Sequence, residues 1–330
     1  MDYKLLGRTG VKVSPLCLGC MNFGWGASEA ASIKIIHRAL DAGINFVDTA
    51  DVYGKGASET IVGKALKNKR DKVFLASKGR GKMGDGPNDT GNSRLHIMAA
   101  CEASLKRLKV DHIDLYQIHR PQSEMALDET LRALDDLVRQ GKVRYIGTST
   151  FAAWQLVESL WQSEKLGLNR FVCEQPPYHI LDRRAERELF PFAQTHGFGI
   201  IPWSPLAGGL LTGKYQRNKK GPKGSRYESG KFRGGGKIPD ATWDIVEAVE
   251  QLAKEKHCAM DALALAWTLQ HPAVTCPIIG PRTLGQLEGN LKALNVTFSE
   301  DELARIDELV PPGTHVVSYY DADFGPLRFS

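Results

Sequence analysis

The 330-residue chain has no long hydrophobic run and few aromatic residues. No stretch approaches the roughly 18 consecutive apolar residues of a membrane-spanning helix, so we expect no membrane partner. The first eight residues lack the apolar segment of a secretory signal, and we therefore expect a cytoplasmic location. Aromatic residues form 8% and charged residues 25% of the chain, which is typical of an ordered globular protein.

Cysteine is also scarce, with six residues scattered along the chain. Cys17 and Cys20 form a C-x-x-C pattern, but residues three apart in a strand point to opposite faces. No second cysteine pair follows at the spacing of a zinc site. We therefore expect reduced thiols in the core of a cytoplasmic protein, and no metal site.

The G-x-G-x-x-G fingerprint of a doubly wound nucleotide-binding sheet is missing after the first predicted strand, where Gly19 to Gly24 reads Gly-Cys-Met-Asn-Phe-Gly. Short apolar runs instead alternate with amphipathic segments. The runs predict strands at 16–19, 45–47 with Asp48 at its end, 73–78, 113–119, 143–148, 171–175, 199–202 and 275–279. The segments predict helices at 29–41, 59–67, 94–108, 127–140, 153–165, 184–196, 242–256, 259–270, 283–294 and 299–309.

Eight alternations without a linker-like gap predict an α/β fold of the closed parallel (β/α)8 type, a TIM barrel, as one domain over residues 1–330. A β-hairpin at 3–14, turning at Thr9-Gly10, should cover the floor of the barrel. The doubly wound sheet is the weaker alternative.

Acidic residues are nearly absent from one segment. Between Lys214 and Lys237 there are nine Lys or Arg residues and one acid, Glu228, whereas the whole chain has a net charge of +5. The positive charge is therefore local, which favours a phosphorylated small ligand and argues against a nucleic-acid partner.

Four polar side chains lie at or just after the ends of consecutive predicted strands: Asp48, Tyr53, Lys78 and His119. Taken singly, each also has a structural reading, such as a turn aspartate or a satisfied histidine. In a barrel, however, the carboxyl ends of the strands converge on one face, where active sites lie. A buried lysine needs an anionic partner, and Asp48 is the natural one.

Such a set suits proton donation by a phenol. Tyrosine ordinarily titrates near pH 10, and we expect the Lys78 ammonium to lower the pKa of Tyr53 while Asp48 holds Lys78 in place. His119 can orient a carbonyl oxygen toward Tyr53. Since no residue can deliver a hydride, the partner reaction would use a nicotinamide cofactor.

The motifs that extend these strand ends carry a resemblance through nearly the whole chain. They are the segments 43–53, 77–78, 111–119 and 141–147, together with Leu6-Gly-Arg-Thr-Gly10. The sequence resembles the aldo-keto reductase family, in the branch similar to bacterial general aldehyde reductases and potassium-channel β subunits. The resemblance implies a catalytic tetrad of Asp48, Tyr53, Lys78 and His119, acting on a small aldehyde or ketone.

The resemblance also implies an NADPH site. Its expected residues are Gly19, Cys20, Met21, Asp48, Ser149, Thr150, Gln175, Trp203, Ser204, Pro205, Leu206, Gly208, Lys214, Arg226, Gly280, Arg282, Gln286 and Asn290. Trp203 would stack on the nicotinamide, and Arg282 would bind the 2′-phosphate. The chain has Gly289 where a glutamate is usual, which weakens one contact to the adenosine. For the substrate we expect an apolar cup from Phe23 and Trp25 next to Tyr53 and His119.

Two other functions are open. A Schiff-base lyase could use Lys78 as nucleophile, but it would have no need of Arg282 or a basic segment. An NADP(H)-binding regulatory subunit, like the channel β subunits, would need little turnover. The resemblance implies asparagine at the position of His119 in those subunits, so the histidine favours an enzyme.

Overall fold

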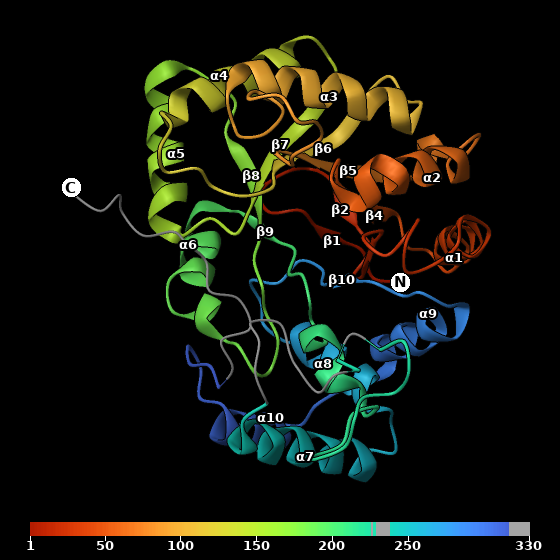
Figure 1. Cartoon of the computed structure of the whole chain (residues 1–330). Helices are drawn as coiled ribbons and strands as arrows, with labels where there is room; N and C mark the ends of the chain where they lie inside the picture. The colour runs from red at the N-terminus through yellow and green to blue at the C-terminus, as the bar shows by residue number, and fades with distance from the viewer. Residues whose placement is uncertain (226, 229–237, 317–330) are drawn as a thin grey trace.

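The structure, a computed structural model, describes residues 1–225, 227–228 and 238–316. A parallel eight-stranded sheet in the order β10-β3-β4-β5-β6-β7-β8-β9 curls into a barrel within these residues (Figure 1). The strands are β3 (Cys17–Gly19), β4 (Phe46–Asp48), β5 (Phe74–Gly79), β6 (Ile113–Ile118), β7 (Val143–Ser149), β8 (Phe171–Gln175), β9 (Gly199–Ile200) and β10 (Ile278–Ile279). The amides of Thr275 and Ile278 donate to Ile200 and Pro202, which closes the ring between its edges. The predicted (β/α)8 barrel is confirmed.

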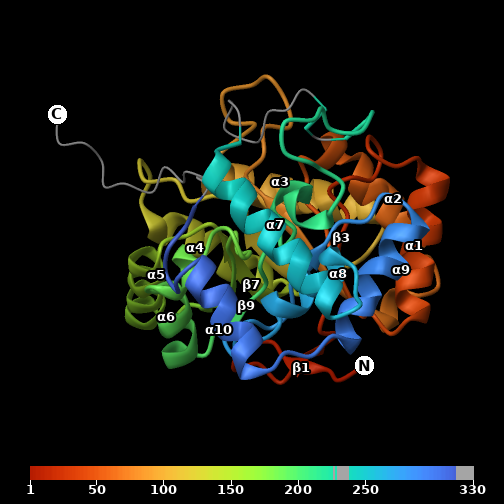
Figure 2. The same ribbon diagram turned by 90° about the horizontal axis from the view of Figure 1, so that it is seen from below.

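Helices surround the strands and follow them in turn. They are α1 (Glu29–Asp41), α2 (Ala57–Ala65), α3 (Arg94–Leu108), α4 (Leu127–Arg139), α5 (Ala153–Leu166), α6 (Leu189–His196), α7 (Asp240–Glu255), α8 (Met260–Thr268), α9 (Leu284–Leu291) and α10 (Glu300–Leu309). Helices α7 and α10 pack on each other beyond α8, as both views show (Figures 1 and 2).

Local sequence explains where these helices begin. Ser28 caps α1, since its hydroxyl accepts from the Ala31 amide, and the buried side chains of α1 recur every three or four residues. The expected capping box at α10 is present, because Ser299 and Glu302 each bond the other's backbone amide. In these two helices a side chain at the N-terminus therefore satisfies a free backbone N–H group.

The predicted hairpin consists of β1 (Lys4–Leu5) and β2 (Lys12–Val13), which pair antiparallel. Its Leu6 and Val13 are fully buried in a cluster with the inward side chains of the barrel strands, including Cys17 and Phe46. Cys20 belongs instead to the outer cluster between strands and helices. The two cysteines thus face opposite sides of the sheet, and all six cysteines are free thiols.

The structure differs from the prediction in several elements. The segment 184–196 is not one helix: a 3₁₀ turn (Arg184–Glu186) precedes α6, which starts so that Pro191 lies in its first turn, where a missing N–H costs little. The strand predicted at 275–279 is reduced to β10, because Pro277 has no amide to donate. The connection after β9 contains a 3₁₀ segment, Ala207–Thr212, that the sequence did not predict.

Close packing of α2 on α3 gives a stability prediction. A Cβ on Gly63 of α2 would overlap the backbone of Leu108 at the end of α3. We expect Gly63→Ala to lower the free energy of unfolding by about 1–3 kcal/mol, since backbone cannot move aside as a side chain can. Urea unfolding followed by circular dichroism measures this. Gly10→Ala is the control, because that Cβ would have no neighbour within 4 Å; equal losses for both variants would contradict the prediction.

Candidate active site

A cavity of about 1030 Å³ opens at the C-terminal ends of the parallel strands. Asp48 ends β4 and is in register with Ala76 of β5, so Lys78, two residues further, projects to the same side as Ala76. His119 follows β6 directly, and Tyr53 begins a 3₁₀ turn (Tyr53–Gly56) that leads into α2. The structure thus brings the four predicted side chains to one end of the cavity.

Lys78 is the centre of this group and is fully buried. Its Nζ donates to Asp48 Oδ2 at 2.6 Å, to the Thr49 carbonyl at 2.9 Å and to Tyr53 Oη at 3.3 Å. All three ammonium protons therefore have acceptors, which a buried ammonium requires. The rings of Tyr53 and His119 meet edge to face, with their centroids 5.7 Å apart.

Burial and charge set the protonation states here. Burial alone would lower the pKa of Lys78, but Asp48 and Tyr53 together hold it above its usual range. The pKa of His119 lies well below its usual value, because of burial first and then the charges of Lys78, Arg120 and Arg80. Lys78 is thus charged and His119 neutral at neutral pH.

The expected lowering of the Tyr53 pKa is wrong in direction. Lys78 does lower it, but burial of the phenol is the larger effect and raises the pKa of Tyr53 above its usual value. Tyr53 therefore holds its proton at neutral pH. A proton-bearing phenol beside an ammonium is still suited to giving a proton away, since the ammonium stabilises the phenolate that remains.

Two glutamines hold the other side of Asp48. Its Oδ1 accepts from Gln117 Nε2 at 3.2 Å and from Gln175 Nε2 at 3.1 Å, and Gln175 Nε2 also reaches Gln117 Oε1 at 3.2 Å. Gln175 was predicted as a cofactor residue, whereas Gln117 was missed. Its position was readable: it precedes His119 by two residues and is in register with Lys78, so both project inward.

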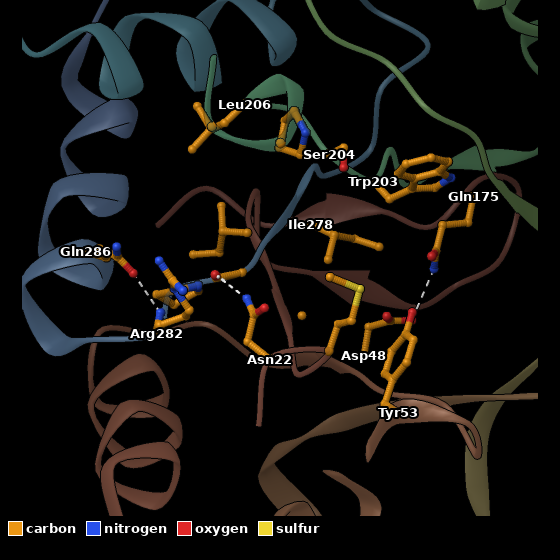
Figure 3. Close-up of a pocket in the computed structure, with 18 of the residues that line it drawn as sticks. Asn22, Asp48, Tyr53, Gln175, Trp203, Ser204, Leu206, Ile278, Arg282 and Gln286 are labelled. Atoms are coloured by element: carbon orange, nitrogen blue, oxygen red, sulfur yellow. Dashed lines mark hydrogen bonds between the residues drawn. The ribbon is translucent and has the colours of Figure 1, made fainter. Parts of the chain in front are cut away.

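Most of the predicted cofactor residues line the cavity. These are Gly19, Met21, Asp48, Ser149, Gln175, Trp203, Ser204, Pro205, Leu206, Gly208, Lys214, Gly280, Arg282, Gln286 and Asn290. Figure 3 shows Asp48, Tyr53 and Gln175 at one end, Arg282 and Gln286 at the other, and Trp203, Ser204 and Leu206 along one wall. Asn22, which was not predicted, also lines it and donates to the Gly280 carbonyl at 2.9 Å.

Three of the predicted cofactor positions are not in the lining. Cys20 and Thr150 are buried behind it, although the Thr150 hydroxyl does accept from Arg120 at 3.0 Å. Arg226 lies outside the described residues. The cavity wall is therefore supplied mainly by the remaining positions.

The far end of the cavity lies at the start of α9. Thr283 caps this helix by accepting from the Gln286 amide, and Gln286 Oε1 accepts from the Arg282 amide at 2.7 Å. These contacts fix the Arg282 backbone next to a helix N-terminus, where the helix dipole also favours an anion. Lys214 lines the same cavity. The chemistry of these donors fits a phosphate group.

The substrate end differs from the apolar cup that we expected. Trp25 lines the cavity and is 62% exposed, while its indole N–H donates to the Met21 carbonyl at 2.6 Å. Phe23 is fully buried in the outer core and does not line the cavity, so its predicted substrate role is not supported. Arg80, Lys82 and Arg120 line this region instead.

Comparison with known proteins accounts for this arrangement. The model of the Aldo/keto reductase family matches residues 15–311. The chain belongs to the aldo/keto reductase family. It is 40% identical to an uncharacterised oxidoreductase of Bacillus subtilis, over 97% of this chain and 99% of that protein. A versiconal hemiacetal acetate reductase of Aspergillus parasiticus is 34% identical, over 96% and 99% of the two chains.

Another relative is named for a different role. A probable voltage-gated potassium channel β subunit of Oryza sativa is 36% identical, over 90% of this chain and 92% of that protein. Membership of an aldo/keto reductase family with oxidoreductase relatives supports an oxidoreductase acting on a small molecule, and the family generally uses NAD(P)H. Across the described part of the chain, every helix is too short or too polar to cross a membrane.

Proposed function

We propose that this aldo/keto reductase reduces aldehydes or ketones to alcohols with NADPH, and that Tyr53 donates the proton. The observation that carries the proposal is the buried Lys78–Asp48 ion pair, with the Tyr53 hydroxyl 3.3 Å from the Lys78 ammonium at the cavity. Bound NADPH would supply the hydride. The residues of the chain would bind and orient the carbonyl compound and move the proton.

Each member of the tetrad has a distinct part in this proposal. The proton on Tyr53 Oη passes to the carbonyl oxygen as negative charge develops there, and the Lys78 ammonium stabilises the phenolate that remains. Neutral His119 can hydrogen-bond the same oxygen without competing as an acid. Asp48, held by Gln117 and Gln175, keeps Lys78 charged and in place.

The cavity suits the cofactor along its length. Ser149 and Gln175 bring a hydroxyl and an amide to the tetrad end, where a carboxamide needs donors and acceptors. Trp203 offers an aromatic face on the same wall, and Arg282 with Lys214 supplies positive charge at the other end. We also propose a cytoplasmic location, because the free thiols suit a reducing compartment.

Arg282 should decide the preference for NADPH over NADH. A guanidinium binds a phosphate monoester through paired, charge-assisted hydrogen bonds, each worth about 1.5–3 kcal/mol. Arg282→Ala should therefore raise the dissociation constant for NADPH about tenfold or more and barely change that for NADH. Fluorescence titration of both cofactors measures this, with the exposed Arg305→Ala as control. Equal losses for the two cofactors would remove Arg282 from the 2′-phosphate site.

The regulatory alternative rests on the similarity to the channel β subunit. It would bind NADPH as the enzyme does but turn over little, so oxidation of NADPH with a panel of short, aromatic and ketoaldehyde substrates separates the two. We favour the enzyme because His119 lies against Tyr53. A Schiff-base lyase is disfavoured, since an ammonium whose pKa is raised by Asp48 is a poor nucleophile.

A further inference from the structure

The tetrad end of the cavity is surrounded by positive charge. Arg80, Lys82 and Arg120 line it, whereas Asp48 and Asp261 are the acidic side chains that line the cavity among the described residues. Asp48 forms an ion pair with Lys78. Asp261 lies next to Gly289, close to α9 and the Arg282 end. The lining of the substrate end therefore has more cationic than anionic side chains.

Arg80 has a backbone conformation that its side chain disfavours. It follows β5 directly, with φ at +112°, in a region where residues other than glycine are strained. Its carbonyl oxygen accepts from the Gly91 amide and from the Thr90 hydroxyl, both at 3.1 Å, which hold the loop in this form. Backbone strain of this kind is retained at sites where the position of a side chain serves a function.

The Arg80 side chain is also incompletely satisfied. Its Nε is buried and has no hydrogen-bond partner within residues 1–225, 227–228 and 238–316. Over the same residues it has no carboxylate within 4.0 Å, although Lys82 has one, the exposed Asp85 at 3.4 Å. Since Arg80 lines the cavity and has no carboxylate partner among these residues, an anion bound in the cavity would be favourable.

Neighbouring groups do not neutralise this charge. Asp51 is the carboxyl beside Gly81, but its Oδ1 accepts from the Val52 amide, and burial raises the pKa of Asp51 to about 7. The charge of Arg80 also helps to lower the pKa of His119, after burial, Lys78 and Arg120. Arg80 also lines the same cavity as Tyr53 and His119, so one small molecule could contact all three.

We propose, on the basis of the proposed function, that the carbonyl substrates carry an oxyanion, which is either a carboxylate or a phosphate. Arg80 binds this oxyanion while the carbonyl oxygen faces Tyr53 and His119. A guanidinium presents paired N–H groups in the geometry of an oxyanion. The ion would accept from the terminal N–H groups of the Arg80 guanidinium, on the side that lines the cavity. Lys82 and Arg120 add attraction at longer range.

The test compares substrates with and without a negative charge on otherwise similar molecules. Reduction of 4-carboxybenzaldehyde and of its methyl ester is measured with NADPH in the wild type and in Arg80→Gln. We expect the acid-to-ester ratio of kcat/KM to be about tenfold or more in the wild type and to fall toward one in Arg80→Gln, mainly through KM for the acid. Arg80→Lys should keep part of the ratio. Exposed Arg132→Gln, on α4, is the matched control and should keep all of it.

A second variant guards against misfolding. Arg80→Gly removes the side chain at a φ that glycine accepts readily, so it should fold at least as stably as the wild type and also lose the ratio. Glyceraldehyde 3-phosphate against glyceraldehyde is the phosphate arm, and the larger ratio identifies the oxyanion. A wild-type ratio near one in both arms, or a ratio unchanged in Arg80→Gln and Arg80→Gly, would overturn the proposal.

Binding separates this proposal from the proposed function. If no aldehyde is reduced, the proposed function fails, and the oxyanion site is then decided by calorimetric titration of benzoate and benzamide into the NADP⁺ complex. We expect benzoate to bind about tenfold or more tightly than benzamide in the wild type, and this difference to disappear in Arg80→Gln. Equal binding of the two compounds to the wild type would refute the site even if neutral aldehydes are reduced.

Discussion

Tyr53→Phe is expected to lower the rate constant of aldehyde reduction by about 10²- to 10⁴-fold while the affinity for NADPH stays the same. The substitution removes the hydroxyl that Lys78 Nζ contacts at 3.3 Å and keeps the ring against His119. Without that hydroxyl, the side chain at position 53 cannot give a proton to the carbonyl oxygen as negative charge develops on it. The loss therefore falls on the chemical step.

Stopped-flow oxidation of NADPH with a reactive aldehyde isolates that step. Tyr3→Phe is the matched control, because it also removes one phenolic hydroxyl, which donates to the Gly43 carbonyl in the hairpin region. The control should react at the wild-type rate. Hydride transfer in Tyr53→Phe within a few-fold of the wild type would refute Tyr53 as the acid and leave the cofactor site alone standing.

Lys78→Met is expected to reduce the same rate constant by a similar factor. Burial raises the pKa of Tyr53, and Lys78 is the largest influence that opposes this rise. Without the ammonium, the phenolate left by proton donation has no neighbouring cation, and Asp48 keeps only the amide donors of Gln117 and Gln175. Both changes raise the activation free energy of the proton transfer.

The double variant tests whether both residues act through one proton transfer. Its rate should lie within a few-fold of the slower single variant, since effects on one step are not additive. Multiplicative losses would mean that Lys78 acts independently of Tyr53. Circular dichroism confirms that each variant is folded, and Lys64→Met, at an exposed ion pair with Glu29, is the control for loss of a lysine.

Several helices and strands could be predicted to the residue because local chemistry defines their ends. Helix α3 begins after the Ser93 cap, and β8 occupies Phe171–Gln175 as predicted. Helix α2 begins at Ala57, two residues before its predicted start, because the turn at Tyr53–Gly56 leads straight into it. In that turn Gly54 and Lys55 have positive φ, so the segment has no helical hydrophobic periodicity from which the start of α2 could be predicted.

In the candidate active site, too, some features could be predicted from the sequence and others required the structure. Asp48, Lys78 and His119 could be predicted because each lies at or next to the end of a strand, and strand ends of a barrel meet at one face. The role of Phe23 could not, since an aromatic residue in a loop can turn either to the core or to the cavity, and here it is fully buried. The pKa of Tyr53 also required the structure, because burial and Lys78 act in opposite directions and the outcome depends on how closely the phenol is covered.

The sequence by itself determined the barrel, the family and the candidate tetrad, because hydrophobic period, strand ends and motif spacing are properties of order along the chain. The tertiary structure alone decided what surrounds that tetrad. Gln117 and Gln175 come from different strands to hold Asp48, and Arg80 is presented to the cavity by a loop tied back at Thr90 and Gly91. Contacts between segments distant in sequence depend on packing and burial, which no local pattern specifies.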